Sequence, residues 1–168
     1  MEELGGLVAH PLVIHVPVVL IPLAAIGVIA LAVRPRLHRS FGVLVASLAG
    51  IGFVGAVLAS RTGEALEERF EEGGQTMSAT LEHHAELGES APIVAGLFFV
   101  AVLVWVLFTR WRARAGEERV AAVARKPAAV AGVLLALSVL AGIAASVTIV
   151  RTGHSGAESV WEDASAVR

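Results

Sequence analysis

Four long apolar runs without a single Asp, Glu, Lys or Arg constrain this chain more than any other feature. They cover approximately residues 12–33, 41–60, 91–109 and 128–150. An α-helix needs roughly 20 such residues to cross the hydrocarbon core of a bilayer. Only 17% of the chain is charged, against about 25% in typical soluble domains. The sequence therefore predicts one all-α domain over residues 1–168, a polytopic four-helix bundle in a membrane.

Basic residues are concentrated in the two short connections at residues 34–39 and 110–126. These connections contain nine of the thirteen Lys and Arg residues, and the rest of the chain contains thirteen of the fifteen acidic residues. Short cytoplasmic loops of membrane proteins are enriched in Lys and Arg, so we expect both termini outside the cytoplasm. The same rule explains the arginines better than nucleic-acid binding does. A chain rich in Arg, Ala and Val is typical of a bacterium, so we expect the bacterial inner (plasma) membrane.

The connection between the second and third runs, residues 62–90, is too long for a simple loop. We expect two short helices there, interrupted at Gly73 and Gly74. The second helix places Met77, Leu81 and His84 on one face. We expect this outer helical loop to lie over the end of the bundle.

A repeated tripeptide suggests that the bundle contains a tandem repeat of two helix pairs. Arg61-Thr62-Gly63 follows the second run, and Arg151-Thr152-Gly153 follows the fourth. Small residues precede both tripeptides at the same offsets, namely Gly52 and Ala56 in one copy and Gly142 and Ser146 in the other. Small residues four apart allow close helix packing, and the two pairs would be related by an axis along the membrane normal. We expect Gly63 and Gly153 to end their helices.

Five of the six histidines fall at the expected outer side of the bundle. Neutral imidazole is the commonest protein ligand for metals and also binds haem iron. We expect His15, His84 and His154 to converge as cofactor or metal ligands, with His84 preferred over its neighbour His83. His10, Arg61 and Arg151 are further candidates for binding a cofactor. With no cysteine in the chain, thiolate metal sites, iron–sulfur clusters and covalently bound haem are excluded.

Three segments together resemble the bacterial membrane family called domain of unknown function 2231. They are "HPLVIHVPVVL" (10–20), "EHHAELG" (82–88) and "RTGHSGAESVW" (151–161). The resemblance covers nearly the whole chain and implies four membrane helices with no assigned function. Members of the family can be joined to Rieske or cytochrome-like modules, which implies a redox setting. The motif positions carried over here are His10, Pro11, His15, Pro17, His84, Gly153 and His154.

Three functions remain open at this level. In the first, the histidines bind haem b in an electron-transfer protein with a membrane redox partner, and Arg61 and Arg151 pair with the propionates; zinc or copper is the alternative ligand. In the second, the chain is a small transporter or channel-like component. In the third, it is a structural or assembly subunit of a membrane complex without a cofactor. We expect no catalytic residues, and the sequence leaves the oligomeric state open.

Overall fold

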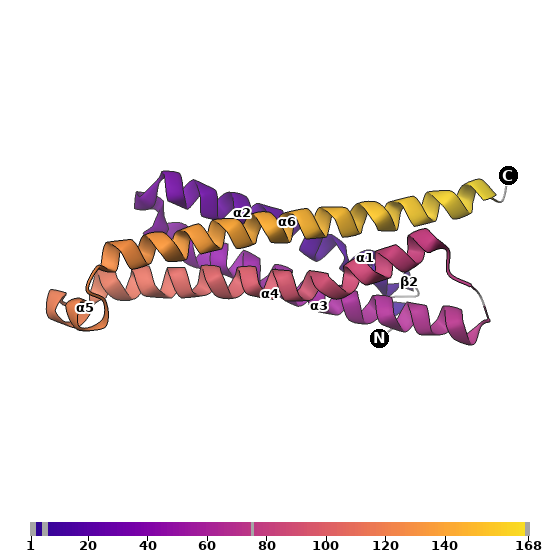
Figure 1. The fold of residues 1–168 in the computed structure, drawn as a ribbon, viewed down its shortest axis with the longest axis horizontal. Coiled ribbons are helices and arrows are strands. Elements are labelled where there is room, and N and C mark those ends of the chain that lie inside the picture. The colour runs from indigo at the N-terminus through magenta and orange to yellow at the C-terminus, as the bar shows by residue number, and fades with distance from the viewer. Residues whose placement is uncertain (1–2, 5–6, 75, 167–168) are drawn as a thin grey trace.

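Four long helices form the molecule, which is described by a computed structural model over residues 3–4, 7–74 and 76–166. They are α2 (His15–Val33), α3 (His38–Glu72), α4 (Ala79–Arg114) and α6 (Pro127–Ala166) (Figure 1). The shorter elements are β1 (Glu3–Leu4), β2 (Leu7–Val8), α1 (Ala9–Val13), the 3-10 helix η1 (Pro35–Leu37) and α5 (Glu117–Val123). Each long helix contains a stretch long and apolar enough to cross a membrane. The predicted all-helical membrane fold is confirmed, apart from the two-residue strands near the N-terminus.

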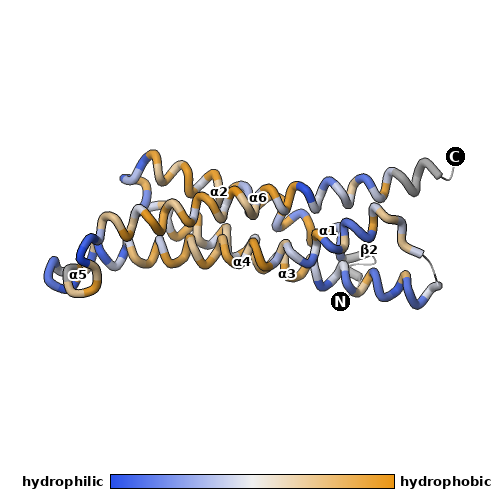
Figure 2. Tube along the Cα trace, in the orientation of Figure 1, coloured by the Kyte–Doolittle hydropathy of each residue, from blue (hydrophilic) through white to orange (hydrophobic). Residues whose placement is uncertain are grey.

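The four helices are arranged as the corners of a square. Helix α2 contacts α3 and α6, and α4 contacts the same two helices. Both chain termini lie at one end of the bundle, and α5 lies at the opposite end (Figure 1). Figure 2 shows an apolar middle section with hydrophilic residues towards both ends. This is the polarity pattern of a bundle that crosses a bilayer.

Small residues on α3 allow α2 to approach closely. A β-carbon added at Gly52 would lie 2.8 Å from Ile21 Cγ1, and one added at Gly55 would lie 2.6 Å from Val16 Cγ1. Both distances are shorter than real side-chain contacts, so only glycine fits without a shift. Such close packing stabilises membrane helix pairs through van der Waals contact, since lipid provides no hydrophobic drive between helices.

The helices continue well beyond the apolar runs, which contradicts the predicted helix ends. Arg61-Thr62-Gly63 lies inside α3, and Arg151-Thr152-Gly153 lies inside α6. A glycine inside a helix costs only about 1 kcal/mol relative to alanine, and the Ala, Leu, Glu and Arg residues that follow Gly63 are good helix formers. The expectation that Gly63 and Gly153 end their helices was therefore wrong.

The connection at residues 62–90 does not fold over the bundle as a separate unit. Its two halves are the C-terminal part of α3 and the N-terminal part of α4. The predicted interruption at Gly73-Gly74 is present, and Gly74 has a positive φ of 66° that favours glycine. Ser78 caps the start of α4 by accepting a hydrogen bond of 3.3 Å from the Leu81 amide.

Helices α1 and α2 follow one another almost without interruption, since Ile14 between them has helical backbone angles and its amide donates to the His10 carbonyl at 3.1 Å. Pro17 lies in the first turn of α2, where the missing N–H of proline is tolerated. The short helix α1 contacts α3 as well as α2. His10, on α1, lies against α3.

Candidate functional site

A large apolar cavity lies at the end of the bundle that carries both termini. Its volume is about 580 Å³, within the range of roughly 300–1,000 Å³ that is typical of ligand pockets. Its walls come from α1, α2, α3, α4 and α6, with Pro17, Phe70, Leu81 and Ile149 among the apolar lining residues. Two histidines, His10 and His84, also line it.

His10 is fixed to α3 through one ring nitrogen. Its Nδ1 lies 3.0 Å from the Ala59 carbonyl oxygen and 3.2 Å from Thr62 Oγ1. The Thr62 hydroxyl donates its own hydrogen to the carbonyls of Leu58 or Ala59 at 3.0 Å. A carbonyl can only accept, and this hydroxyl is already donating, so His10 Nδ1 carries the hydrogen.

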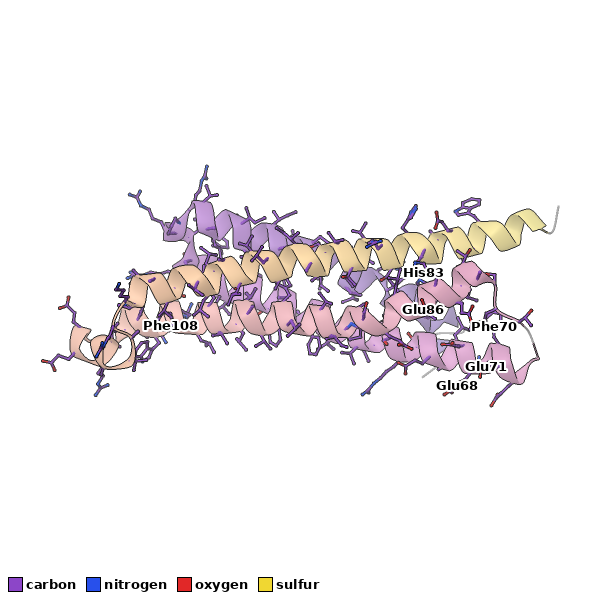
Figure 3. All side chains as sticks on the ribbon, in the orientation of Figure 1. Glu68, Phe70, Glu71, His83, Glu86 and Phe108 are labelled. Atoms are coloured by element: carbon purple, nitrogen blue, oxygen red, sulfur yellow. The ribbon has the colours of Figure 1, made fainter. Side chains whose placement is uncertain are left out.

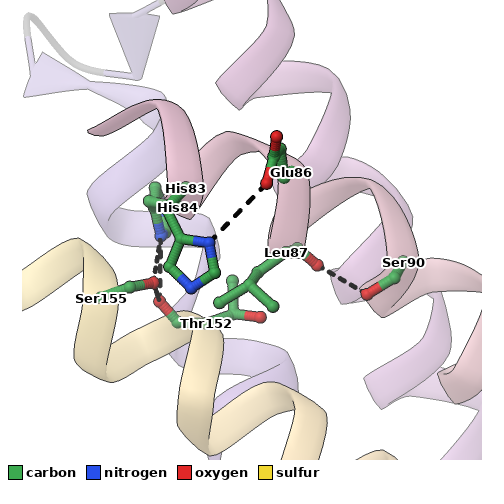
Figure 4. Close-up of polar contacts among 7 residues, drawn as sticks. All are labelled: His83, His84, Glu86, Leu87, Ser90, Thr152 and Ser155. Carbon is green, nitrogen blue, oxygen red and sulfur yellow. Dashed lines mark hydrogen bonds and ion pairs between the residues drawn. The ribbon is translucent and has the colours of Figure 1, made fainter. Parts of the chain in front are cut away.

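His84 is fixed to α6 in the same manner. Its Nδ1 lies 2.9 Å from the Thr152 carbonyl oxygen and 3.2 Å from Ser155 Oγ (Figure 4). The Ser155 hydroxyl donates to the Thr152 carbonyl at 2.9 Å, so it accepts from the imidazole. His83, which precedes His84 in the chain, is exposed, and its Nδ1 lies 3.7 Å from a carboxylate oxygen of Glu86 (Figure 4). The structure therefore places His84, and not His83, at the cavity, as expected.

The two fixed imidazoles face each other across the end of the bundle. Their ring centroids are 6.2 Å apart, and the ring planes are inclined by 76°. In a neutral ring with its hydrogen on Nδ1, the second nitrogen, Nε2, has a free lone pair. Neither Nε2 atom has a hydrogen-bond partner among the described residues. Every buried polar side-chain atom in this part of the chain does have a partner, so the two Nε2 atoms are not buried. Both Nε2 atoms are therefore accessible from the cavity.

The matched contacts revise the predicted correspondence between the two halves of the chain. His10 bonds Thr62 and packs on Gly63, whereas His84 bonds Ser155 and packs on Gly156. Thr62 thus corresponds to Ser155, three residues beyond the Thr152 that the tripeptide alignment assigns. The matched contacts agree with a repeat of helix pairs, but the repeat itself stays a prediction.

The three histidines predicted to converge do not do so. His15 is exposed, and its Nδ1 donates to the Pro11 carbonyl, four residues earlier in α1, at 2.8 Å. His154 is exposed and pairs with Glu158 at 3.2 Å on the surface of α6. Within the described part of the chain, no three His, Asp or Glu side chains are placed to hold one metal ion. The convergence was mispredicted because helix rotation about its axis depends on packing, which directs these two rings outward.

The arginines expected beside a cofactor lie elsewhere. Arg61 and Arg151 are exposed, and neither lines the cavity. The charged residues in the cavity wall are instead Glu64, Glu67 and Glu89. Further carboxylates, including those of Glu68 and Glu71, lie at the same end of the molecule (Figure 3). The cavity thus combines an apolar wall, two free imidazole nitrogens and acidic side chains.

The predicted helix face is confirmed in part: Leu81 and His84 of α4 line the cavity, and Met77 also lines it but precedes α4. The role of His10 was underestimated, because the sequence analysis favoured His15, His84 and His154 and gave His10 only as a further candidate. Each histidine of the pair contacts a hydroxyl residue followed by glycine, Thr62-Gly63 for His10 and Ser155-Gly156 for His84. Thr152-Gly153 shows the same pattern, so the pattern alone does not identify the pair. The hydroxyl accepts from the imidazole, and the glycine leaves room for the ring.

Fold and site together define a polytopic four-helix membrane protein with a fixed pair of histidines at one end. A family model described as "Predicted membrane protein (DUF2231)" matches residues 6–168, and the chain belongs to this family. This confirms the resemblance found in the sequence. No curated protein and no solved structure matches the chain.

Proposed function

We propose that the cavity binds haem b through His10 and His84, and that the protein takes part in electron transfer. The observation that carries the proposal is the identical fixing of the two rings, with each Nδ1 held by a main-chain carbonyl and a hydroxyl. Histidines that bind metals almost always donate their other N–H to such an acceptor. The acceptor fixes the tautomer and increases the basicity of the free nitrogen.

The spacing of the two rings is consistent with both imidazoles binding the same metal ion. Two imidazoles that bind one metal ion at about 2.0–2.1 Å would have their ring centroids within roughly 6 Å of each other. The observed separation is 6.2 Å. The cavity is much larger than a single ion requires, and its wall is mostly apolar, which suits a macrocycle.

The chain's own contribution is positional and electrostatic. Haem, when bound, supplies one-electron chemistry. The two helices α3 and α6 fix the orientation of the imidazoles through their backbones, and the apolar wall excludes water. Arg61 and Arg151 do not line the cavity, so the proposal rests on the imidazoles and the wall alone. With both termini outside the cytoplasm, a partner would exchange electrons at the outer face of the membrane.

A bare zinc or copper ion is the second candidate. It is favoured by the carboxylates of Glu64, Glu67 and Glu89 in the cavity wall, because these oxygens attract a cation and repel propionates. No third ligand joins the imidazole pair among the described residues. An ion would therefore complete its coordination with water, whereas haem iron needs only two axial ligands.

The test uses the exposed histidines as matched controls. We expect the full chain, purified from haem-sufficient cells, to show the spectrum of a low-spin haem with two imidazole ligands. His10→Ala and His84→Ala should lose it, and His15→Ala and His154→Ala should retain it. Added imidazole should restore the low-spin spectrum in His84→Ala, because the substitution vacates space for the free ligand.

Three other outcomes would contradict the proposal. Stoichiometric zinc or copper without haem would favour the second candidate. Equal loss of haem from all four variants would show that the His10–His84 pair has no special role. A chain with neither haem nor metal would leave a structural subunit or a small transporter, with the two histidines acting as ties between helices.

A further inference from the structure

A second cavity lies at the opposite end of the bundle, near α5. Its volume is about 390 Å³. Its apolar wall comes from the membrane-spanning parts of three helices and includes Leu31 of α2, Trp105 of α4 and Leu135 of α6. Its polar side chains are His38, Thr109, Arg39 and Arg112. None of the described residues that line it is acidic, in contrast to the histidine cavity.

The polar side of this cavity is held in place by contacts between helices. His38 Nε2 lies 2.8 Å from Thr109 Oγ1, and the His38 ring packs edge-on against Trp105 with centroids 4.7 Å apart. Arg112 donates from Nη1 to the Pro127 carbonyl at 3.1 Å. These contacts link the start of α3 to α4, and α4 to the start of α6.

No carboxylate in the described part of the chain neutralises either arginine at this cavity. Among the described residues, the acceptor for Arg112 is a main-chain carbonyl, and Arg39 has no ion pair. A guanidinium has five N–H donors, so most donors of both side chains remain available. Guanidinium groups bind phosphate through pairs of such donors.

We propose that this cavity binds the headgroup of an anionic phospholipid. The apolar wall belongs to segments that cross the membrane, and the arginines follow where those segments end. The cavity therefore spans the depth at which the phosphate and glycerol of a lipid lie. Basic pockets between membrane helices can bind anionic headgroups at this level. The ligand chemistry is a phosphate ester attached to an apolar chain.

Trp105 provides a reporter within the cavity wall. The full chain, with Trp111→Phe and Trp161→Phe, is reconstituted in vesicles of phosphatidylcholine containing a minor fraction of phosphatidylglycerol brominated near the acyl carboxyl end. Bromine quenches tryptophan on contact. We expect brominated phosphatidylglycerol to quench Trp105 more strongly than brominated phosphatidylcholine does at the same fraction. Each arginine should increase the binding preference for phosphatidylglycerol over phosphatidylcholine by about fivefold.

Two kinds of variant separate a specific site from general attraction. Arg39→Gln with Arg112→Gln should abolish the preference, whereas Arg36→Gln with Arg114→Gln should retain it, because this second pair lies at the same end but outside the cavity. Gly132→Leu should exclude the lipid without a change in charge, since a β-carbon at Gly132 meets nothing within 4 Å. Circular dichroism checks that each variant keeps its helices.

Three results would overturn the proposal. The first is equal quenching by the two brominated lipids. The second is an equal effect of the two double arginine substitutions, which would indicate only long-range attraction to the membrane surface. The third is displacement of the brominated phosphatidylglycerol by millimolar inorganic phosphate, which would assign the arginines to a free anion.

Discussion

Gly156 is the position at which a single methyl group should disturb the histidine pair most directly. A β-carbon there would lie 2.8 Å from Cε1 of His84, 3.1 Å from Nδ1 and 3.2 Å from Nε2. Ordinary contacts begin near 3.4 Å, so Gly156→Ala forces the ring to move by roughly half an ångström. The ring is rigid, and its Nδ1 is held by the Thr152 carbonyl and by Ser155 on the same helix. The shift therefore weakens those hydrogen bonds.

The expected loss of folding stability combines two destabilising contributions and one stabilising contribution. Overpacking typically costs about 1–3 kcal/mol. A weakened hydrogen bond adds about 0.5–1.5 kcal/mol. The better helix propensity of alanine returns about 1 kcal/mol. We therefore expect Gly156→Ala to lower the free energy of unfolding by about 0.5–3.5 kcal/mol and to weaken haem binding.

Gly63→Ala is the matched control. Its β-carbon would lie 3.3 Å from Cε1 of His10, so a shift of a tenth or two of an ångström relieves the contact. The gain in helix propensity should offset this small cost, leaving stability nearly unchanged. Both variants are compared by chemical unfolding in detergent micelles, followed by circular dichroism, and by haem titration. Equal stability and equal haem affinity of the two variants would refute the reasoning.

Three further predictions concern the bundle and its orientation. Gly55→Ala should destabilise the contact between α2 and α3 by about 1–3 kcal/mol, because its β-carbon would lie 2.6 Å from Val16, while Gly88→Ala, with nothing within 4 Å, should not; thermal unfolding in detergent compares them. Ser78→Ala removes the cap of α4 and should cost about 1 kcal/mol, seen as faster hydrogen exchange in its first turn and nowhere else. A reporter fused after Arg168, which lies outside the described residues, should be active only outside the cytoplasm.

The membrane spans could be predicted from the sequence because lipid imposes a length and a composition on any helix that crosses it. The helix ends could not, since a helix that leaves the membrane needs no apolar residues to continue. Around Gly63, the loss of hydropathy was mistaken for the end of the helix. Water and the following Glu, Ala and Leu residues support α3 as far as Glu72.

The site was only partly predictable for a related reason. The sequence favoured His84 over His83, and Leu81, three residues before it on α4, lines the cavity with it. It favoured His15 over His10, whereas the structure fixes the His10 ring to α3 and leaves the His15 ring exposed. The two residues are five apart, about 140° on a helix, so the rotation of the first helix decides which of them faces the bundle. The tripeptide alignment also equated Thr62 with Thr152 instead of Ser155. Three residues are nearly one helical turn, so the two alignments place similar residues on nearly the same face.

The extension of α3 beyond the membrane has a consequence for how another protein would meet this one. Residues 61–72 continue the helix past the apolar run, and at 1.5 Å per residue they rise about 18 Å. The histidine cavity is lined from Ala56, within the apolar run, to Phe70 near the tip of this extension. A water-soluble protein could therefore dock on the projecting helices and approach the His10–His84 pair without entering the bilayer.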